Sequence, residues 1–247
     1  MDPNRIDIEK TWGSAWLIYK SNLKSILLII LVIYFPFFII RLVFPYEQIY
    51  NRFGYTVYDI TNNMVELIGS LVGVIAFISL AIITEHSVLG LEFTIRDVFV
   101  KALSRWWAYI KAILLSVLIV SLYLLLFIIP GFVKSIQYAF VTYAAALRDV
   151  TGKKALDFSK SITKGQRWRV FGFYLLIWLL GIGPAISYFY LLHLAEYDRI
   201  ILHGALIINY FISPFFSILF GVLFLDLEKQ WNEDVVEDPY EHSLSSP

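Results

Sequence analysis

The sequence predicts an all-α, polytopic integral membrane protein with six transmembrane helices and three cytoplasmic interfacial amphipathic helices. Three observations predict this class: 59% of the 247 residues are hydrophobic, only 16% are charged, and the mean hydropathy is +0.70. A soluble domain carries about 45–50% apolar and about 25% charged residues. The chain is therefore too apolar for a water-soluble domain, and its apolar residues gather in runs that are long enough to cross a bilayer.

Six apolar runs have, or nearly have, the roughly 20 residues that a helix needs to cross a bilayer core. The expected spans cover about residues 23–44, 65–84, 109–129, 131–147, 170–192 and 201–225. Pro130 and Gly131 are expected to end the third span and turn the chain, because one continuous helix over 108–148 would be about 60 Å long. The fourth span is the shortest. It crosses the bilayer only if the helix restarts at Gly131 and if Lys134 extends its amine toward the headgroups.

The distribution of basic residues predicts the orientation. With six spans both termini lie on one side, and the segments on that side carry 16 of the 20 Lys and Arg residues. Because cytoplasmic loops carry the excess of basic residues, we expect both termini in the cytoplasm, on the inner face of the cell membrane. Residues 1–231 then form the membrane domain, and residues 232–247 form an acidic tail that we expect to be disordered. A sharper hypothesis is that this tail docks on the basic segment before the fifth span.

An amphipathic helix is predicted before each of the first, third and fifth spans, because apolar residues recur there on one helical face. The stripes are Ile8, Trp12, Ala15 and Tyr19 in the first segment, Ile95, Phe99, Ala102 and Trp106 in the second, and Ala155, Phe158 and Ile162 in the third. Thr94 and Asp97 supply a start signal for the second helix. The chain therefore divides into three parallel units, each an amphipathic helix followed by a membrane hairpin.

Tryptophan and basic residues mark the cytoplasmic face as a binding surface. Tryptophan is enriched at membrane interfaces, and each basic residue near the surface attracts anionic lipid by about 1 kcal/mol. The residues expected to bind lipid or a protein partner are Trp12, Trp106, Trp107, Lys153, Lys154, Lys160, Lys164, Arg167, Trp168 and Arg169. The simpler interpretation is that the basic residues only anchor the chain, without selectivity for a ligand.

A resemblance to a known family rests on three stretches. They are Ile128-Ile129-Pro130-Gly131-Phe132, then Tyr138-Ala139-Phe140, and then the segment from Ala155 to Gly165. Together they resemble the membrane domain of glycerophosphoryl diester phosphodiesterases and its stand-alone multipass relatives, best over residues 108–192. In that family the chemistry belongs to a separate soluble barrel domain, which has no counterpart in these 247 residues. The resemblance therefore implies a membrane domain and supplies no catalytic residue.

Residues that could carry chemistry are sparse. The chain has no cysteine and four histidines, and it contains no phosphate-binding glycine loop, no HExxH motif and no dinucleotide fingerprint. We therefore expect no catalytic residue and no cofactor. His193 and Glu196 are weak metal candidates, because their spacing puts them on one helical face. They fall in the polar link between the fifth and sixth spans, where a solvated loop explains them more simply.

The favoured function is that of a non-enzymatic scaffold or accessory subunit that binds membrane lipids or a protein partner through its cytoplasmic face. The formal net charge is zero, so no basic field indicates nucleic acid. The first alternative is a permease-like module with an uncharged cavity between the fifth and sixth spans. The residues of that cavity would be Gln137, Gly183, Pro184, Asn209 and Pro214. The second alternative is a membrane enzyme or metal site in the link 193–203. The sequence indicates no oligomeric state.

Overall fold

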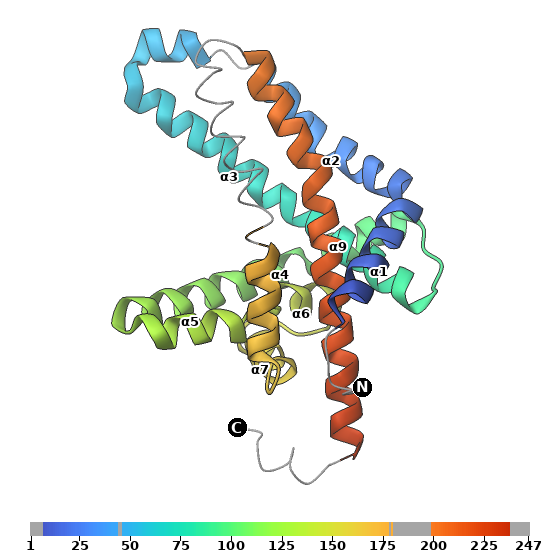
Figure 1. Cartoon of the computed structure of the whole chain (residues 1–247). Helices are drawn as coiled ribbons and strands as arrows, with labels where there is room; N and C mark the ends of the chain where they lie inside the picture. The colour runs from blue at the N-terminus through green and yellow to red at the C-terminus, as the bar shows by residue number, and fades with distance from the viewer. Residues whose placement is uncertain (1–6, 44–45, 178, 180–198, 238–247) are drawn as a thin grey trace.

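A computed structural model describes residues 7–43, 46–177, 179 and 199–237, and these residues form helices without any strand (Figure 1). The helices are α1 (Ile8–Ser21), α2 (Leu23–Val43), α3 (Tyr46–Leu89), α4 (Ile95–Leu126), α5 (Ile128–Gln137), α6 (Val141–Leu147), α7 (Lys153–Ile162) and α9 (Arg199–Glu237). Residues 167–177 are also helical. The predicted all-α class is confirmed.

Several helices have the length and composition of membrane spans. Among the described residues, Gln48–Leu89, Ile95–Leu126 and Phe211–Glu233 qualify, and α1 with Leu23–Phe37 makes a fourth if this pair, bent by 70°, forms one span. Three to four helices of this length and composition indicate a membrane protein. The fifth expected span, 170–192, lies mostly outside the described residues, so the number six stays a prediction.

The turn between the third and fourth expected spans comes earlier than Pro130. α4 ends at Leu126, Phe127 has an extended backbone (φ −152°), and α5 begins at Ile128. Pro130 thus lies in the first turn of α5, where its missing N–H leaves no helical hydrogen bond unmade. A helical hairpin forms, but it turns at Phe127, and a membrane crossing by its second arm stays a prediction.

Gly131 holds the two arms of this hairpin together. A Cβ atom on Gly131 would lie 2.6 Å from the backbone nitrogen of Leu124, so α4 and α5 approach here as closely as only glycine allows. At the other end of the hairpin, Arg105 of α4 donates from Nη1 to the carbonyl oxygen of Arg148 at 2.6 Å. The arms therefore run antiparallel, and in Figure 1 the hairpin extends to the left of the view.

The fourth expected span is two helices rather than one. The helical pattern is interrupted between α5 and α6, and Ser159 of α7 bonds to the interruption: its Oγ donates to Gln137 O at 2.8 Å and accepts from Phe140 N at 3.1 Å. Thr163 Oγ1 donates to Ser159 O at 2.9 Å. Side chains thus replace the helical hydrogen bonds that the break removes, and α7 is fixed to the hairpin.

The core is formed where the second helices of the three units meet. A Cβ atom on Gly221 of α9 would lie 3.1 Å from Thr84 Cγ2 of α3 and 3.3 Å from Tyr143 Cε1 of α6. Tyr143 also donates its hydroxyl to Ser217 O at 2.7 Å and stacks on Phe224 with ring centroids 5.8 Å apart. We call α3, α6 and α9 the return helices, since they are expected to bring the chain back to the cytoplasmic side.

Helices also occupy the three segments with apolar stripes, and each stripe faces protein except at Ile8, which is 46% exposed. α1 packs on α9, the first half of α4 packs on α3, and α7 packs on α6. Each unit thus places its first helix on the return helix of a neighbouring unit, in a cyclic order. At each contact one stripe alanine, Ala15, Ala102 or Ala155, is completely buried. A position of these helices at a membrane surface stays a prediction.

The acidic end of the chain begins as a helix. α9 continues to Glu237, so the expected domain boundary at residue 231 falls inside it. Side-chain contacts one turn apart support this extension: Gln230 donates to Asp226 at 3.3 Å, and Lys229 lies 3.8 Å from Glu233. Residues 238–247 of the expected tail lie outside the described residues.

Candidate functional site

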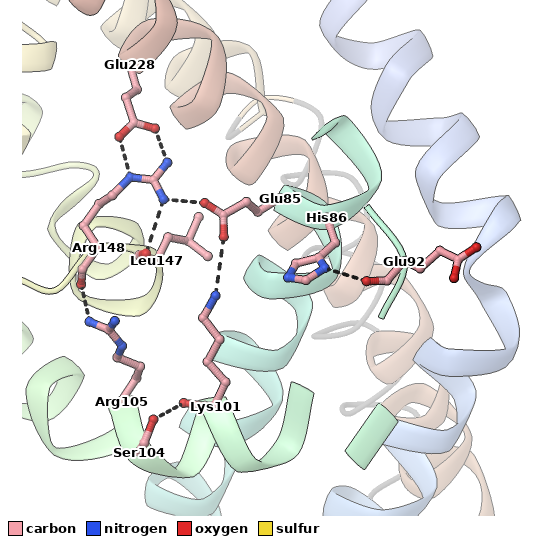
Figure 2. A network of polar contacts seen from close by, with 9 residues as sticks. All are labelled: Glu85, His86, Glu92, Lys101, Ser104, Arg105, Leu147, Arg148 and Glu228. Atoms are coloured by element: carbon pink, nitrogen blue, oxygen red, sulfur yellow. Dashed lines mark hydrogen bonds and ion pairs between the residues drawn. The ribbon is translucent and has the colours of Figure 1, made fainter. Parts of the chain in front are cut away.

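Charged side chains from all three return helices meet at one end of the core (Figure 2). Arg148, directly after α6, donates from Nε and Nη2 to Glu228 of α9 and from Nη1 to Glu85 of α3. Glu85 and Glu228 are buried, with 7% and 8% of their surface exposed. We call Glu85, Arg148 and Glu228 the ionic clamp, because one guanidinium joins the end of α6 to α3 and α9.

Residues of α4 extend the ionic clamp on one side. Lys101 Nζ lies 3.8 Å from Glu85 Oε2, and Arg105 Nη1, which also bonds to the Arg148 carbonyl, donates to Asp149 Oδ1 at 2.8 Å. His86, next to Glu85, contacts the backbone oxygen of Glu92 at 3.3 Å through Nδ1, and no metal arrangement results. Within the described ranges, no group of three or more His, Asp or Glu side chains could hold a metal ion.

The electrostatics of the ionic clamp favour a structural role. The hydrogen bonds to Glu228, reinforced by those to Glu85, raise the pKa of Arg148 above its ordinary value, although burial opposes the charge. The guanidinium therefore stays charged at any physiological pH and is not a proton donor. A buried charge is tolerated when it is paired and hydrogen-bonded, and removal of one partner leaves an uncompensated charge. The ionic clamp thus joins helices.

The basic segment before the fifth expected span forms an exposed surface. Lys153, Lys154, Lys160 and Lys164 are exposed, whereas Ala155, Leu156, Ser159 and Ile162 of α7 are buried. In the part of the chain that the structure describes, no carboxylate forms an ion pair with these four lysines. We call Lys153, Lys154, Lys160 and Lys164 the α7 basic face. The structure therefore brings together four of the residues expected to bind lipid or a partner.

The two expected arginines beside this surface differ from each other. Arg169 donates from Nη1 to Gln166 Oε1 at 2.8 Å. Arg167 is half-buried, and its Nε is buried without a hydrogen-bond partner among the described residues. Trp168 between them is 82% exposed. Trp168 is thus available to an external ligand, and the half-buried Arg167 has an Nε whose hydrogen-bonding capacity is unfilled by the described residues.

The other expected tryptophans divide between packing and exposure. Trp106 donates from Nε1 to Leu71 O at 2.8 Å, and Trp12 packs edge-on against Phe215, with ring centroids 5.2 Å apart. Trp107 is 56% exposed, with Lys111 Nζ 5.5 Å from its ring. Trp12 and Trp106 therefore contribute to helix packing, and Trp107 stays free for a membrane or partner.

The residues of the expected cavity do not form one site among the described residues. Gln137 is buried at the end of α5, and its Oε1 has no hydrogen-bond partner. Pro214 lines a cavity of about 170 Å³ that lies between α9, α2 and α3 instead of beside the fifth expected span. Asn209 is part of α9. Gly183 and Pro184 lie outside the described residues, as do the weak metal candidates His193 and Glu196.

The third unit contacts the helical start of the acidic segment. Gln166 Nε2 donates to Gln230 Oε1 at 3.3 Å, and Phe158 of α7 packs edge-on against Trp231 at 5.9 Å between ring centroids. These contacts are an amide pair and an aromatic pair. Docking of the acidic tail on the α7 basic face through ion pairs stays a hypothesis.

Comparison of the chain with models of protein families, with curated proteins and with solved structures finds no match. The resemblance to the membrane domain of glycerophosphoryl diester phosphodiesterases therefore stays a prediction. Function has to be inferred from the geometry of the ionic clamp and the surfaces around it.

Proposed function

We propose that this protein is a non-enzymatic scaffold of the inner membrane, with both termini cytoplasmic, and that its α7 basic face binds the anionic headgroups of the inner leaflet. One observation supports the proposal most directly. The four lysines are exposed and lack a described ion-pair partner, while the opposite side of α7 is fixed to the hairpin by Ser159. A rigid helix with unpaired positive charge attracts anionic lipid by about 1 kcal/mol per residue.

The position of the ionic clamp agrees with this orientation. Glu85, Arg148 and Glu228 all lie in segments that the distribution of basic residues assigns to the cytoplasm. α7 begins only five residues after Arg148, so the α7 basic face belongs to the same end of the molecule. This arrangement suits a scaffold, because the ionic clamp joins the helices beside the α7 basic face and so holds the binding surface in one place.

The test compares two sets of four substitutions in the full-length protein, reconstituted in nanodiscs of phosphatidylglycerol and phosphatidylcholine. One variant changes the α7 basic face, Lys153, Lys154, Lys160 and Lys164, to Gln. The control changes four exposed basic residues of the other units, Lys20, Lys24, Arg96 and Lys111, to Gln. With the other six tryptophans changed to Phe in both variants, energy transfer from Trp168 to labelled phosphatidylglycerol reports local enrichment. We expect the enrichment of phosphatidylglycerol to fall about tenfold in the first variant, because a loss of about 1.4 kcal/mol in binding free energy is a factor of ten. Equal enrichment in both variants would refute the proposal.

A permease-like module is the second candidate, and the cavity beside Pro214 favours it. The lining includes the side chains of Tyr34, Ser213 and Ser217, and Ser217 Oγ is buried without a hydrogen-bond partner. An unpaired hydroxyl beside an uncharged cavity suits a small neutral polar solute. Swelling of proteoliposomes in such solutes, abolished by Ala76→Trp in the cavity lining, would support transport. Swelling no faster than that of empty liposomes would exclude it.

A further inference from the structure

An open, mostly apolar groove of about 370 Å³ lies where α5 approaches the helix of residues 167–177. Its lining comes from Phe132, Ser135, Ile136 and Ala139 on one side and from Phe171, Tyr174 and Leu175 on the other. The rings of Phe132 and Phe171 meet edge to face at 5.1 Å, and Tyr174 donates its hydroxyl to Ala139 O at 3.1 Å. These contacts fix the two walls, while Phe132 and Leu175 remain 45% and 40% exposed.

Arg167 lies one helical turn before Phe171, which lines the groove. Residues three and four apart share a helical face, so Arg167 precedes Phe171 by one turn and Tyr174 by two on the side that lines the groove. Trp168 packs edge-on against Phe171, with ring centroids 6.1 Å apart, and is otherwise exposed. The groove therefore has a cationic and aromatic entrance and an apolar interior.

The unpaired Nε of Arg167 indicates the kind of ligand. A buried guanidinium N–H without an acceptor is unfavourable, and phosphate oxygens match the guanidinium in geometry and charge. Arg169 already donates to Gln166, so Arg167 is the better phosphate ligand of the two. Lys164, three residues earlier, adds positive charge from the α7 basic face. An apolar groove that begins at a phosphate ligand suits a phospholipid.

We propose that the groove binds one anionic phospholipid, with the phosphate at Arg167 and one acyl chain between Phe132, Phe171 and Leu175. This proposal deepens the proposed function, because it names a site at which one lipid is held specifically beside the diffuse attraction of the α7 basic face. The shared chemistry is a phosphate group: free phosphate would need only Arg167, whereas a phospholipid needs Arg167 and the groove.

The test counts the lipids that remain on the full-length protein after detergent washing, by native mass spectrometry. The probes are phosphatidylglycerol and phosphatidylcholine with the same acyl chains. Ser135→Trp fills the groove, and Ser121→Trp, at an exposed serine of α4 that does not line it, is the matched control. Arg167→Gln removes the phosphate ligand, with Arg96→Gln as its control and Arg167→Lys as the charge-conserving variant.

We expect one retained phosphatidylglycerol on the unmodified protein and on both controls. Arg167→Gln should reduce its retention about tenfold, as expected for loss of one charge-assisted contact, and leave phosphatidylcholine unchanged. Arg167→Lys should restore part of the loss. Ser135→Trp should reduce retention of both lipids. Equal retention in Ser135→Trp and Ser121→Trp would overturn the proposal, and so would displacement of the lipid by inorganic phosphate.

The two proposals can fail separately. If the variant of the α7 basic face loses enrichment while Ser135→Trp retains its lipid, the groove proposal is wrong and the proposed function stands. If that variant keeps full enrichment while Ser135→Trp loses the bound lipid, the proposed function is wrong and the groove stands. Thermal unfolding of each variant identifies a general loss of folding, and Arg167→Lys keeps the groove proposal testable if Ser135→Trp fails to fold.

Discussion

The two ends of the hairpin from α4 to α6 differ in which side chains they bury. We call the end where Arg105 contacts Arg148 the base, and the turn at Phe127 the tip. At the base, the carboxylates of Glu85 and Glu228 are buried and paired with Arg148. At the tip, Leu125, Phe127 and Ile128 are exposed by 84%, 65% and 77%. Burial of an unpaired charge is costly, so the base needs partners, whereas exposed apolar side chains are costly only in water. The difference indicates that the hairpin crosses apolar surroundings, with the base at one boundary and the turn at Phe127 at the opposite one.

The largest expected effect on the free energy of unfolding comes from removing Arg148 from the ionic clamp at the base. Arg148→Leu leaves two buried carboxylates without their partner, so we expect a loss of about 3–5 kcal/mol in the free energy of unfolding. Lys229→Leu is the control, because its pair with Glu233 is exposed on both sides and is worth about 0–1 kcal/mol. Reversible unfolding in mixed micelles measures both. Similar losses in the two variants would show that the ionic clamp contributes no more than a surface pair.

The second prediction compares two positions along α4. Leu118 lies between base and tip and is 57% exposed, whereas Val100, 61% exposed, precedes the base. Leu118→Lys should cost about 2.5–3.5 kcal/mol if lipid surrounds this arm. Val100→Lys should stay within about 0.5 kcal/mol, as at an ordinary surface position. The same unfolding assay measures both losses. An equal loss at both positions would show that the α4 arm of the hairpin is surrounded by water.

The third prediction concerns the packing of the tip. Gly131→Ala would place a Cβ atom 2.6 Å from the backbone nitrogen of Leu124, so the arms must separate. We expect a loss of about 1–3 kcal/mol, typical of overpacking. Gly172 has no heavy atom within 4 Å of its ideal Cβ position, so Gly172→Ala should be neutral or stabilising by up to about 1 kcal/mol. If Gly131→Ala is as well tolerated as Gly172→Ala, the close approach of the arms is wrong.

The smallest expected effect lies near the base, at two adjacent tryptophans. Trp106→Phe removes the hydrogen bond to Leu71 O and should cost about 0.5–1.5 kcal/mol. Trp107→Phe changes an exposed ring and should alter the free energy of unfolding by less than about 0.5 kcal/mol. The reverse order of the two losses would contradict the assignment of Trp106 to packing.

Much of the helical organisation could be predicted from local sequence. The apolar stripes identify the segments of α1, α7 and the first half of α4, and Thr94 begins α4 as expected, accepting from Asp97 N at 3.2 Å. The hairpin was predicted with its turn at Pro130 rather than Phe127, because a proline is equally compatible with the end of one helix and the first turn of the next. The break between α5 and α6 depends on Ser159, from a different helix.

The ionic clamp was missed because it depends on tertiary packing. Arg148 lies 63 residues from Glu85 and 80 residues from Glu228 in the sequence, so no local pattern joins them. The signal was present as a charged residue within three positions of the end of each return span, acidic at 85, basic at 148 and acidic at 228. Charges of opposite sign at equivalent ends of neighbouring helices predict an ion pair, once the helices are known to converge.

The most direct test of the account is the sidedness of the base and the tip. The chain has no cysteine, so Ser87→Cys, Thr151→Cys and Phe127→Cys each introduce a single thiol. We expect a membrane-impermeant thiol reagent applied to intact cells to label the cysteine at 127 and to reach those at 87 and 151 only after permeabilisation. Labelling at 87 or 151 in intact cells, or protection at 127 until permeabilisation, would contradict the three-hairpin topology and the cytoplasmic ionic clamp.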